Sequence, residues 1–417
     1  MLMPEYFEGK TDLVEQYYRQ YEDYLLKKIA ETLLKAGEVG GKVDRYLFIL
    51  EQLELSDCEI IEKLAKLTKQ SQSAVRKVLQ GSVMTSFSSD KEVLERYFEG
   101  DFGPINNPVI VEVMNAEWIK TCGELENLTS TTMNQYHMDV VNLLDQAELR
   151  VASGVQSYSS AVCEVLDNYA KSGMVINYPT GARRSLEAAV RCAVVTSMNQ
   201  TAAQVTNRYI AEGGIKYVLV SAHSGARHSD KGGLYSHDEW QGKAYKIRGS
   251  EEGYPNLLES TGYDINPYTG EGQVVNPHGL HGYNCRHSHQ PWAKDLRNPW
   301  INDDGTPKVS ASESQKVYEN QQRQRAIERG IRQNKRQLLI KQAQIDSLPA
   351  DSIERANAEA DYDILAYRLR QKNKAYNEFC EKYDLTRQSD RLKAAGFGRD
   401  ESRKAYSAAK GVVDLAP

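Results

Sequence analysis

Cysteine is scarce in this 417-residue sequence, and no two cysteines are close together. Six are present, the gaps between successive ones run from 29 to 95 residues, and no Cys-X-X-Cys pair occurs. This spacing argues against a disulfide framework and against a structural zinc site with four cysteine ligands. The six are Cys58, Cys122, Cys163, Cys192, Cys285 and Cys380.

Long apolar runs are missing as well. Segments such as Ala188–Val195 and Tyr217–Ala222 are far shorter than the roughly 18 apolar residues that a transmembrane helix needs. The first ten residues include Glu5 and Glu8 and lack the apolar core of a secretory signal. We therefore expect neither a membrane span nor secretion. We expect the protein to be synthesised in the cytoplasm and to stay there.

The familiar signatures of nucleotide-binding and hydrolytic enzymes are absent too. The chain has no phosphate-binding loop, no Rossmann glycine pattern, no Gly-X-Ser-X-Gly and no His-Glu-X-X-His. The tripeptide His237-Asp238-Glu239 begins like a zinc-protease motif, but no second histidine follows it at helical spacing. The sequence predicts a protein that is not an enzyme.

What the chain does have is an uneven distribution of charge. The formal net charge is −5, yet residues 1–300 carry −9 and residues 301–417 carry +4. Residues 316–341 hold eight basic side chains against only Glu319 and Glu328. Two interpretations are open: these basic residues contact DNA phosphates without sequence preference, or they solvate a helix balanced by acidic groups of the chain or a neighbouring subunit. They are Lys316, Arg323, Arg325, Arg329, Arg332, Lys335, Arg336 and Lys341.

The spacing of apolar residues predicts a mainly α-helical N-terminal region. Between Thr11 and Ala36 apolar side chains recur every three or four residues, and Gly37 predicts the end of that helix. Shorter helices are expected over residues 43–55, after Ser56 as a capping residue, and over residues 71–81. Beyond a linker rich in glycine and proline, longer helices are predicted at 136–150, 155–171 and 185–212.

The pattern changes after Gly213-Gly214. Residues 215–221 are typical of a strand, and about 70 residues rich in Gly, His, Pro, Asn and Tyr follow them. So long a loop-rich segment is usually functional or held together by some internal link. Further on, residues 314–345 and 351–383 predict two long helices that meet at Pro349.

The predicted fold class is therefore mainly α. It comprises a multi-helix N-terminal region, a small loop-rich α+β central domain and a C-terminal helical hairpin. The predicted domains are 1–103, 104–212, 213–300 and 301–417.

Seven of the eight histidines fall in one 67-residue window, which also contains Cys285. Imidazole nitrogen and thiolate sulfur are ligands that zinc prefers, so a zinc site drawn from His223, His281, Cys285 and His287 is one interpretation. A second needs no metal: imidazoles both donate and accept, and so tie turns together. A third is a catalytic dyad of Cys285 with a histidine, which needs a base close to the thiol. Spacing alone leaves all three open.

Four phrases in this window carry a family resemblance. In this order, over about 70 residues, they resemble the signature of minor capsid proteins of tailed phages. That family is phage minor capsid protein 2, related to the Mu F-like head morphogenesis proteins. The phrases are Val220-Ser221-Ala222-His223 with Gly225-Ala226-Arg227, Trp240-Gln241-Gly242-Lys243, Tyr254-Pro255-Asn256-Leu257 and Asn284-Cys285-Arg286-His287.

The signature positions are His223, Trp240, Gly242, Asn284, Cys285, Arg286 and His287. Mu F-like proteins end this motif with Asn-Cys-Arg-Cys, whereas this chain has histidine at the last position. A pair of thiolate ligands is therefore impossible here, and the resemblance assigns no catalytic role to these positions.

The resemblance implies a structural protein of the virion, present in several copies or as a homo-oligomer near the portal vertex or inner capsid surface. The implied roles are head assembly, DNA packaging or genome delivery, with the portal protein and the major capsid protein as partners. Before assembly the protein would be in the host cytoplasm. An alternative is a metal-dependent hydrolase or nuclease, or an effector delivered with the genome, in which Asp238, Glu239 or His287 acts beside a metal-bound water.

Overall fold

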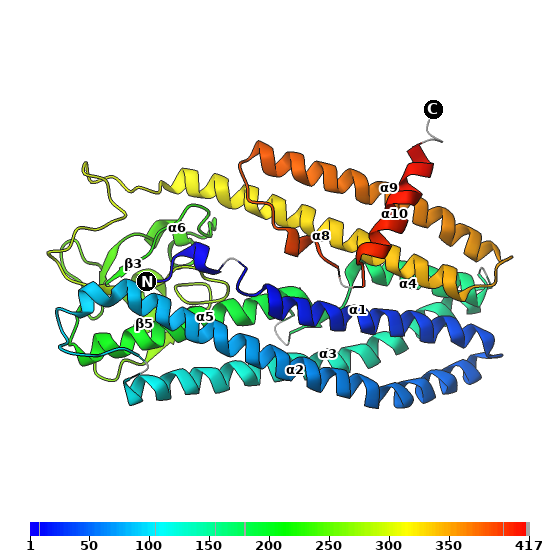
Figure 1. The fold of residues 1–417 in the computed structure, drawn as a ribbon, viewed down its shortest axis with the longest axis horizontal. Helices are drawn as coiled ribbons and strands as arrows, with labels where there is room; N and C mark the ends of the chain where they lie inside the picture. The colour runs from blue at the N-terminus through cyan, green and yellow to red at the C-terminus, as the bar shows by residue number, and fades with distance from the viewer. Residues whose placement is uncertain (8, 105, 155, 179–180, 395, 414–417) are drawn as a thin grey trace. The chain divides into compact units, whose positions relative to one another are not determined.

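The computed structural model describes residues 1–7, 9–104, 106–154, 156–178, 181–394 and 396–413. The chain is 66% helical with few short strands, which confirms the mainly α fold class. Within the described residues we find no helix with the length and apolar character of a membrane span. Figure 1 labels the elements.

The chain divides into two compact units, each assembled from three segments. Unit 1 comprises Met1–Val14, Ser71–Leu125 and Val190–Gln322. Unit 2 comprises Glu15–Gln70, Glu126–Ala189 and Arg323–Pro417.

The helices differ widely in length. The long ones are α1 (Asp12–Lys35), α2 (Lys42–Leu94), α3 (Pro108–Ala152), α5 (Leu186–Glu212), α8 (Ala311–Ser347) and α9 (Ile353–Lys382). Shorter ones are α4 (Tyr158–Ser172), α6 (His237–Trp240), α7 (Leu257–Thr261) and α10 (Arg399–Val413). The 3-10 turns are η1 (Pro4–Phe7), η2 (Ala36–Glu38), η3 (Gly233–Tyr235) and η4 (Ser389–Leu392).

The prediction of short helices after α1 was wrong, because α2 continues without a break from Lys42 to Leu94. Ser56 does not start a helix; its hydroxyl donates to the carbonyl of Gln52 one turn earlier. Gly37 lies inside η2 and lacks the positive φ of a left-handed cap. A continuous buried face explains the long helix, since packing outweighs local capping signals. That face includes Ile49, Leu53, Ile60, Leu67, Val75 and Leu79.

Unit 1 contains a three-stranded antiparallel sheet. The predicted strand forms β3 (Tyr217–Val220), which lies between β4 (Ala244–Lys246) and β7 (His289–Trp292). A separate hairpin pairs β5 (Tyr263–Ile265) with β6 (Gly272–Val274). A buried apolar core surrounds these strands and includes Tyr209, Val218, Trp240, Tyr245 and Cys285. The loop-rich segment is therefore ordered around an apolar core.

Unit 2 contains the predicted C-terminal hairpin. Figure 1 shows α9 running back alongside α8, with α10 packed against α9. Ile331 and Leu338 of α8 share an apolar core with Leu365 and Leu369 of α9. The amide of Asn334 donates to the carbonyl of Leu365 over 2.9 Å. The sequence did not predict the short hairpin of this unit, in which β1 (Val175–Asn177) pairs with β2 (Arg183–Ser185).

Candidate functional site

Three buried side chains of unit 1 converge on one point. His237 is the first residue of α6, and Cys285 and His287 lie in the loop before β7. The two Nδ1 atoms are 3.3 Å apart, and Cys285 Sγ lies 4.0 Å from that of His237 and 3.8 Å from that of His287. Each side chain is at most 2% exposed. Among the described residues, these form a group of potential metal ligands whose ligand atoms lie within 4.8 Å of one another.

Strand pairing brings the two parts of this cluster together. Val220 at the end of β3 lies opposite His289 at the start of β7. The backbone N–H of Ser221 then donates to the carbonyl of Ser288 over 2.9 Å. On the other side of β3, Leu219 lies opposite Ala244 at the start of β4. The chain that leaves α6 for β4 and the loop that enters β7 therefore both reach the C-terminal end of β3, although about 40 residues separate them in sequence.

Aromatic rings enclose the cluster. The ring of Trp240 lies 4.5 Å from that of His237 and 4.8 Å from that of His287, measured between centroids. The half-exposed ring of His223 lies 4.5 Å from that of His287, and its Nδ1 is 2.9 Å from the carbonyl oxygen of Ser224. Four of the signature positions thus lie in or against the cluster.

Burial keeps the cluster neutral. Burial, with a smaller contribution from the charge of Arg227, lowers the pKa of His237 to about 3. Burial likewise lowers the pKa of His287 well below its usual value. Burial raises the pKa of the Cys285 thiol to about 11. A buried thiol of this kind is a poor nucleophile, which weighs against the catalytic dyad.

His281 takes part in a different buried chain. Its Nδ1 lies 3.0 Å from Asn199 Oδ1, and its Nε2 lies 2.7 Å from Nδ1 of His289. His289 Nε2 lies 2.9 Å from Asn207 Oδ1, and the amide of Asn207 is 2.7 Å from the hydroxyl of Tyr263. All ring nitrogens of His281 and His289 therefore have partners. This is the metal-free arrangement that the sequence left open, and it ties α5 to the loop and to β7.

The loop has an unusual backbone. His281 and Asn284 have φ of 58° and 53°, a left-handed conformation that is uncommon outside glycine. Gly242 also has positive φ, and a Cβ there would lie 3.2 Å from the Cβ atoms of Ala222 and Trp300. Such strain persists where surrounding contacts fix the chain, as they do on both sides of Cys285.

The carboxylates nearest in sequence are occupied elsewhere. Asp238 accepts from the hydroxyl of Ser236 over 2.7 Å and lies 2.9 Å from Nδ1 of His228. This hydrogen bond raises the pKa of His228. Glu239 accepts from the backbone N–H of Gly233 over 2.9 Å. Among the described residues, neither carboxylate belongs to the converging group.

Comparison with known proteins gives the family. The sequence model of the family phage minor capsid protein 2 matches residues 2–381 of this chain. The chain belongs to this family. No curated protein and no solved structure matches it. As a phage minor capsid protein, it is a structural protein of the phage head and the virion that interacts with other phage structural proteins.

Several of the eight basic residues of α8 in this minor capsid protein make internal contacts. Arg332 pairs with Glu187 over 3.0 Å, and Lys341 pairs with Asp167 over 2.6 Å. Lys335 donates to a backbone carbonyl over 2.7 Å, and Arg336 to another over 3.4 Å. Arg325 is half-buried. The exposed members are Lys316, Arg323 and Arg329.

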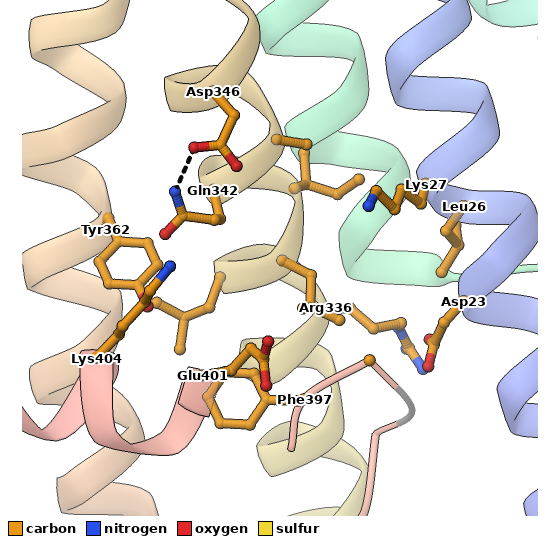
Figure 2. A pocket seen from close by; sticks show the side chains of 15 residues that line it. Asp23, Leu26, Lys27, Arg336, Gln342, Asp346, Tyr362, Phe397, Glu401 and Lys404 are labelled. Atoms are coloured by element: carbon orange, nitrogen blue, oxygen red, sulfur yellow. Dashed lines mark hydrogen bonds between the residues drawn. The ribbon is translucent and has the colours of Figure 1, made fainter. Parts of the chain in front are cut away.

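Unit 2 contains a cavity of about 290 Å³ that the sequence did not indicate. Figure 2 shows Arg336 reaching toward Asp23, with Tyr362, Glu401 and Lys404 also lining the cavity. One carboxylate oxygen of Asp23 has no hydrogen-bond partner, and burial raises the pKa of this group well above its usual value. Because the lining comes from four helices far apart in sequence, no local motif could have predicted it.

Proposed function

We propose that this minor capsid protein is a non-enzymatic component of the portal vertex or inner capsid surface, present in several copies. It would act there in head assembly, DNA packaging or genome delivery, with the portal protein and the major capsid protein as partners. The family match over residues 2–381 carries the proposal. The buried thiol and the occupied carboxylates support a role without catalysis.

An exposed apolar stripe on α2 supports protein contacts. Val43, Leu47 and Leu50 are 70%, 60% and 53% exposed and lie on one helix face at spacings of four and three residues. On the other side of the helix, Arg45 pairs with Glu148 of α3, with Nε to Oε1 at 2.5 Å. The stripe is therefore presented by a helix that is held in place, as a contact surface requires.

Incorporation into particles tests this proposal. We expect Leu47→Ser/Leu50→Ser to fold and yet to be depleted from purified heads, measured by quantitative mass spectrometry against the portal protein. Glu62→Ser/Lys66→Ser changes two exposed charged residues on another face of the same helix, about three turns or more beyond the stripe, and should be incorporated normally. Cryo-electron microscopy of wild-type particles should place the protein at the portal vertex or inner surface. Absence from particles, or a position on the outer surface, would overturn the proposal.

The same proposal includes contact with packaged DNA. Of the eight basic residues of α8, we assign this contact to the three that are exposed. Each phosphate contact contributes about −0.9 to the slope of log affinity against log salt, so three contacts give roughly −3. Substituting Lys316, Arg323 and Arg329 by Gln should flatten this slope. Substituting the exposed Arg368, Lys374 and Lys382 of α9 should leave it unchanged. No retention of the wild-type protein on DNA at low salt would exclude the contact.

A further inference from the structure

We propose that His237, Cys285 and His287 bind a zinc ion that links α6 to the loop before β7. The directions of two imidazole lone pairs carry this proposal more than the residue types do.

Gln241 determines which nitrogen of His287 carries the proton. The backbone N–H of His223 donates to Gln241 Oε1 over 2.9 Å, and because an N–H can only donate, the atom facing it is the oxygen. His287 Nε2 lies 3.0 Å from the same oxygen and must donate to it. A neutral imidazole carries one N–H, so Nδ1 of His287 presents a lone pair.

A backbone carbonyl determines which nitrogen of His237 carries the proton. Its Nε2 lies 2.7 Å from the carbonyl oxygen of His278, which can only accept. Nε2 therefore carries the proton of the neutral ring. Nδ1 of His237 presents a lone pair toward His287 and Cys285.

Two lone pairs thus face each other at 3.3 Å with no proton between them. The single S–H of Cys285 can be directed at only one of them, and its distances of 3.8 and 4.0 Å make a weak contact. Protonation of one imidazole would place a proton between the two nitrogens, but burial disfavours the charged ring. Nearby Arg227 does not supply the charge either, because it donates to the carbonyls of His278 and Tyr283. A metal ion between the three atoms satisfies all of them.

The distances fit tetrahedral zinc. Bond lengths of about 2.0–2.1 Å to nitrogen and about 2.3 Å to sulfur place two nitrogen ligands about 3.3 Å apart, and nitrogen and sulfur about 3.6 Å apart. The observed separations are 3.3 Å between the nitrogens and 3.8 and 4.0 Å to the sulfur. Closure by a few tenths of an ångström completes the geometry.

The surrounding contacts are those of metal-bound histidines. Such rings donate their other N–H to a carbonyl or amide oxygen, as His237 and His287 do. The amide of Asn199 donates to the carbonyls of Cys285 and His287, each over 2.9 Å, and so holds both ligands in place. Two imidazoles and a thiolate are a donor set that suits zinc. A water molecule takes the fourth position, and the thiol proton leaves to solvent when the metal binds.

Metal content of the untagged full-length protein, purified without chelator, tests the proposal. Elemental analysis should find about one zinc per chain in the wild type and at least a tenfold loss in Cys285→Ser and His287→Gln. Cys192→Ser removes another buried thiol of unit 1, and His278→Gln removes an exposed ring of the same loop. Both should retain the metal. No stoichiometric zinc, or equal zinc in all variants, would overturn the proposal.

Cobalt substitution provides a test on the wild-type protein, so it does not depend on whether a variant folds. After removal of its metal, the wild-type protein should bind Co²⁺ with a thiolate charge-transfer band in the near ultraviolet and the strong visible absorption of a tetrahedral site. Only weak visible absorption without the thiolate band would show binding elsewhere and would contradict the assignment. Neither result depends on where the protein lies in the virion.

Discussion

A buried ionic network in unit 2 and the loop before β7 in unit 1 satisfy their buried polar side chains in different ways. In unit 2, Glu187 is shared by two guanidinium groups, at 3.4 Å from Arg19 and 3.0 Å from Arg332. Around the loop of unit 1, the buried groups are neutral imidazoles and amides, such as His281 and Asn199. In the network of unit 2 the chain supplies its own cations, whereas around this loop of unit 1 it relies on hydrogen bonds.

The difference shows what is exceptional about His237 and His287. The chain of His281 and His289 is completed when the Asn207 amide is turned so that its NH2 group donates to His289 Nε2 and its oxygen accepts from the Tyr263 hydroxyl, because each ring nitrogen then faces a complementary group. At His237 and His287 two lone pairs meet, and no described residue places a cation between them, whereas Arg19 and Arg332 provide cations at Glu187 in unit 2. Burying polar groups without a partner costs free energy, and a bound metal ion would remove that cost by satisfying both lone pairs.

The largest effect is expected from breaking the ionic network of unit 2. Glu187→Gln leaves the buried Arg332 facing a neutral amide, while Arg19 keeps its ion pair with Glu15, and should lower the free energy of unfolding by about 3 kcal/mol, measured by urea denaturation. Glu359→Gln removes an exposed partner of Arg355 and should cost at most about 1 kcal/mol. Equal losses would show that the buried network contributes no more than a surface pair.

Removing the amide that supports the loop of unit 1 comes next. Asn199→Ala leaves the carbonyls of Cys285 and His287 and Nδ1 of His281 without their partner, and should cost about 3 kcal/mol. Hydrogen exchange measured peptide by peptide should accelerate in the loop of unit 1 and stay unchanged in α9. The exposed Asn357→Ala is the control. Unchanged exchange in the loop would mean that these hydrogen bonds do not hold it.

Removal of the metal should affect only unit 1. A ligand present at 100 times its dissociation constant stabilises the folded state by about 2.7 kcal/mol. A chelator should therefore speed hydrogen exchange around His237 and Cys285 and leave the ionic network of unit 2 unaffected, and added zinc should restore protection. If the chelator acts equally on both units, the distinction between them fails.

The smallest effect is a pH dependence confined to unit 2. Burial, with the nearby charge of Arg332, lowers the pKa of Lys335 to about 8, from 10.5 in the unfolded chain. Between these values the unfolded chain binds more protons, so stability due to this group should rise as the pH increases from about 8 to 9.5. Urea midpoints should show this rise in the wild type, but not in Lys335→Met. The same slope in both proteins would assign it to other groups.

The sequence predicted those elements that have a strong periodicity of their own. The helices α1, α5, α8 and α9 and the strand β3 form close to the predicted positions. Continuous α2 was missed because Ser56 and Gly81 resemble local stops, while the buried face that continues past them depends on tertiary packing.

The candidate site was predicted only in part, for a geometric reason. Cys285 and His287 are two residues apart and converge as expected, but His281 points away, toward Asn199 and His289. His237 was missed as a ligand because the pairing of β4 and β7 with β3, not sequence spacing, brings α6 close to the loop before β7. Its place in the histidine-rich window, three residues before the signature residue Trp240, was the signal that the sequence offered.

X-ray absorption at the zinc edge of the full-length protein tests the metal assignment most directly. We expect a first shell with nitrogen at about 2.0–2.1 Å and one sulfur at about 2.3 Å, with the sulfur lost in Cys285→Ser. Zinc surrounded only by nitrogen and oxygen in the wild type, or no bound zinc, would contradict the claim that His237, Cys285 and His287 form a metal site.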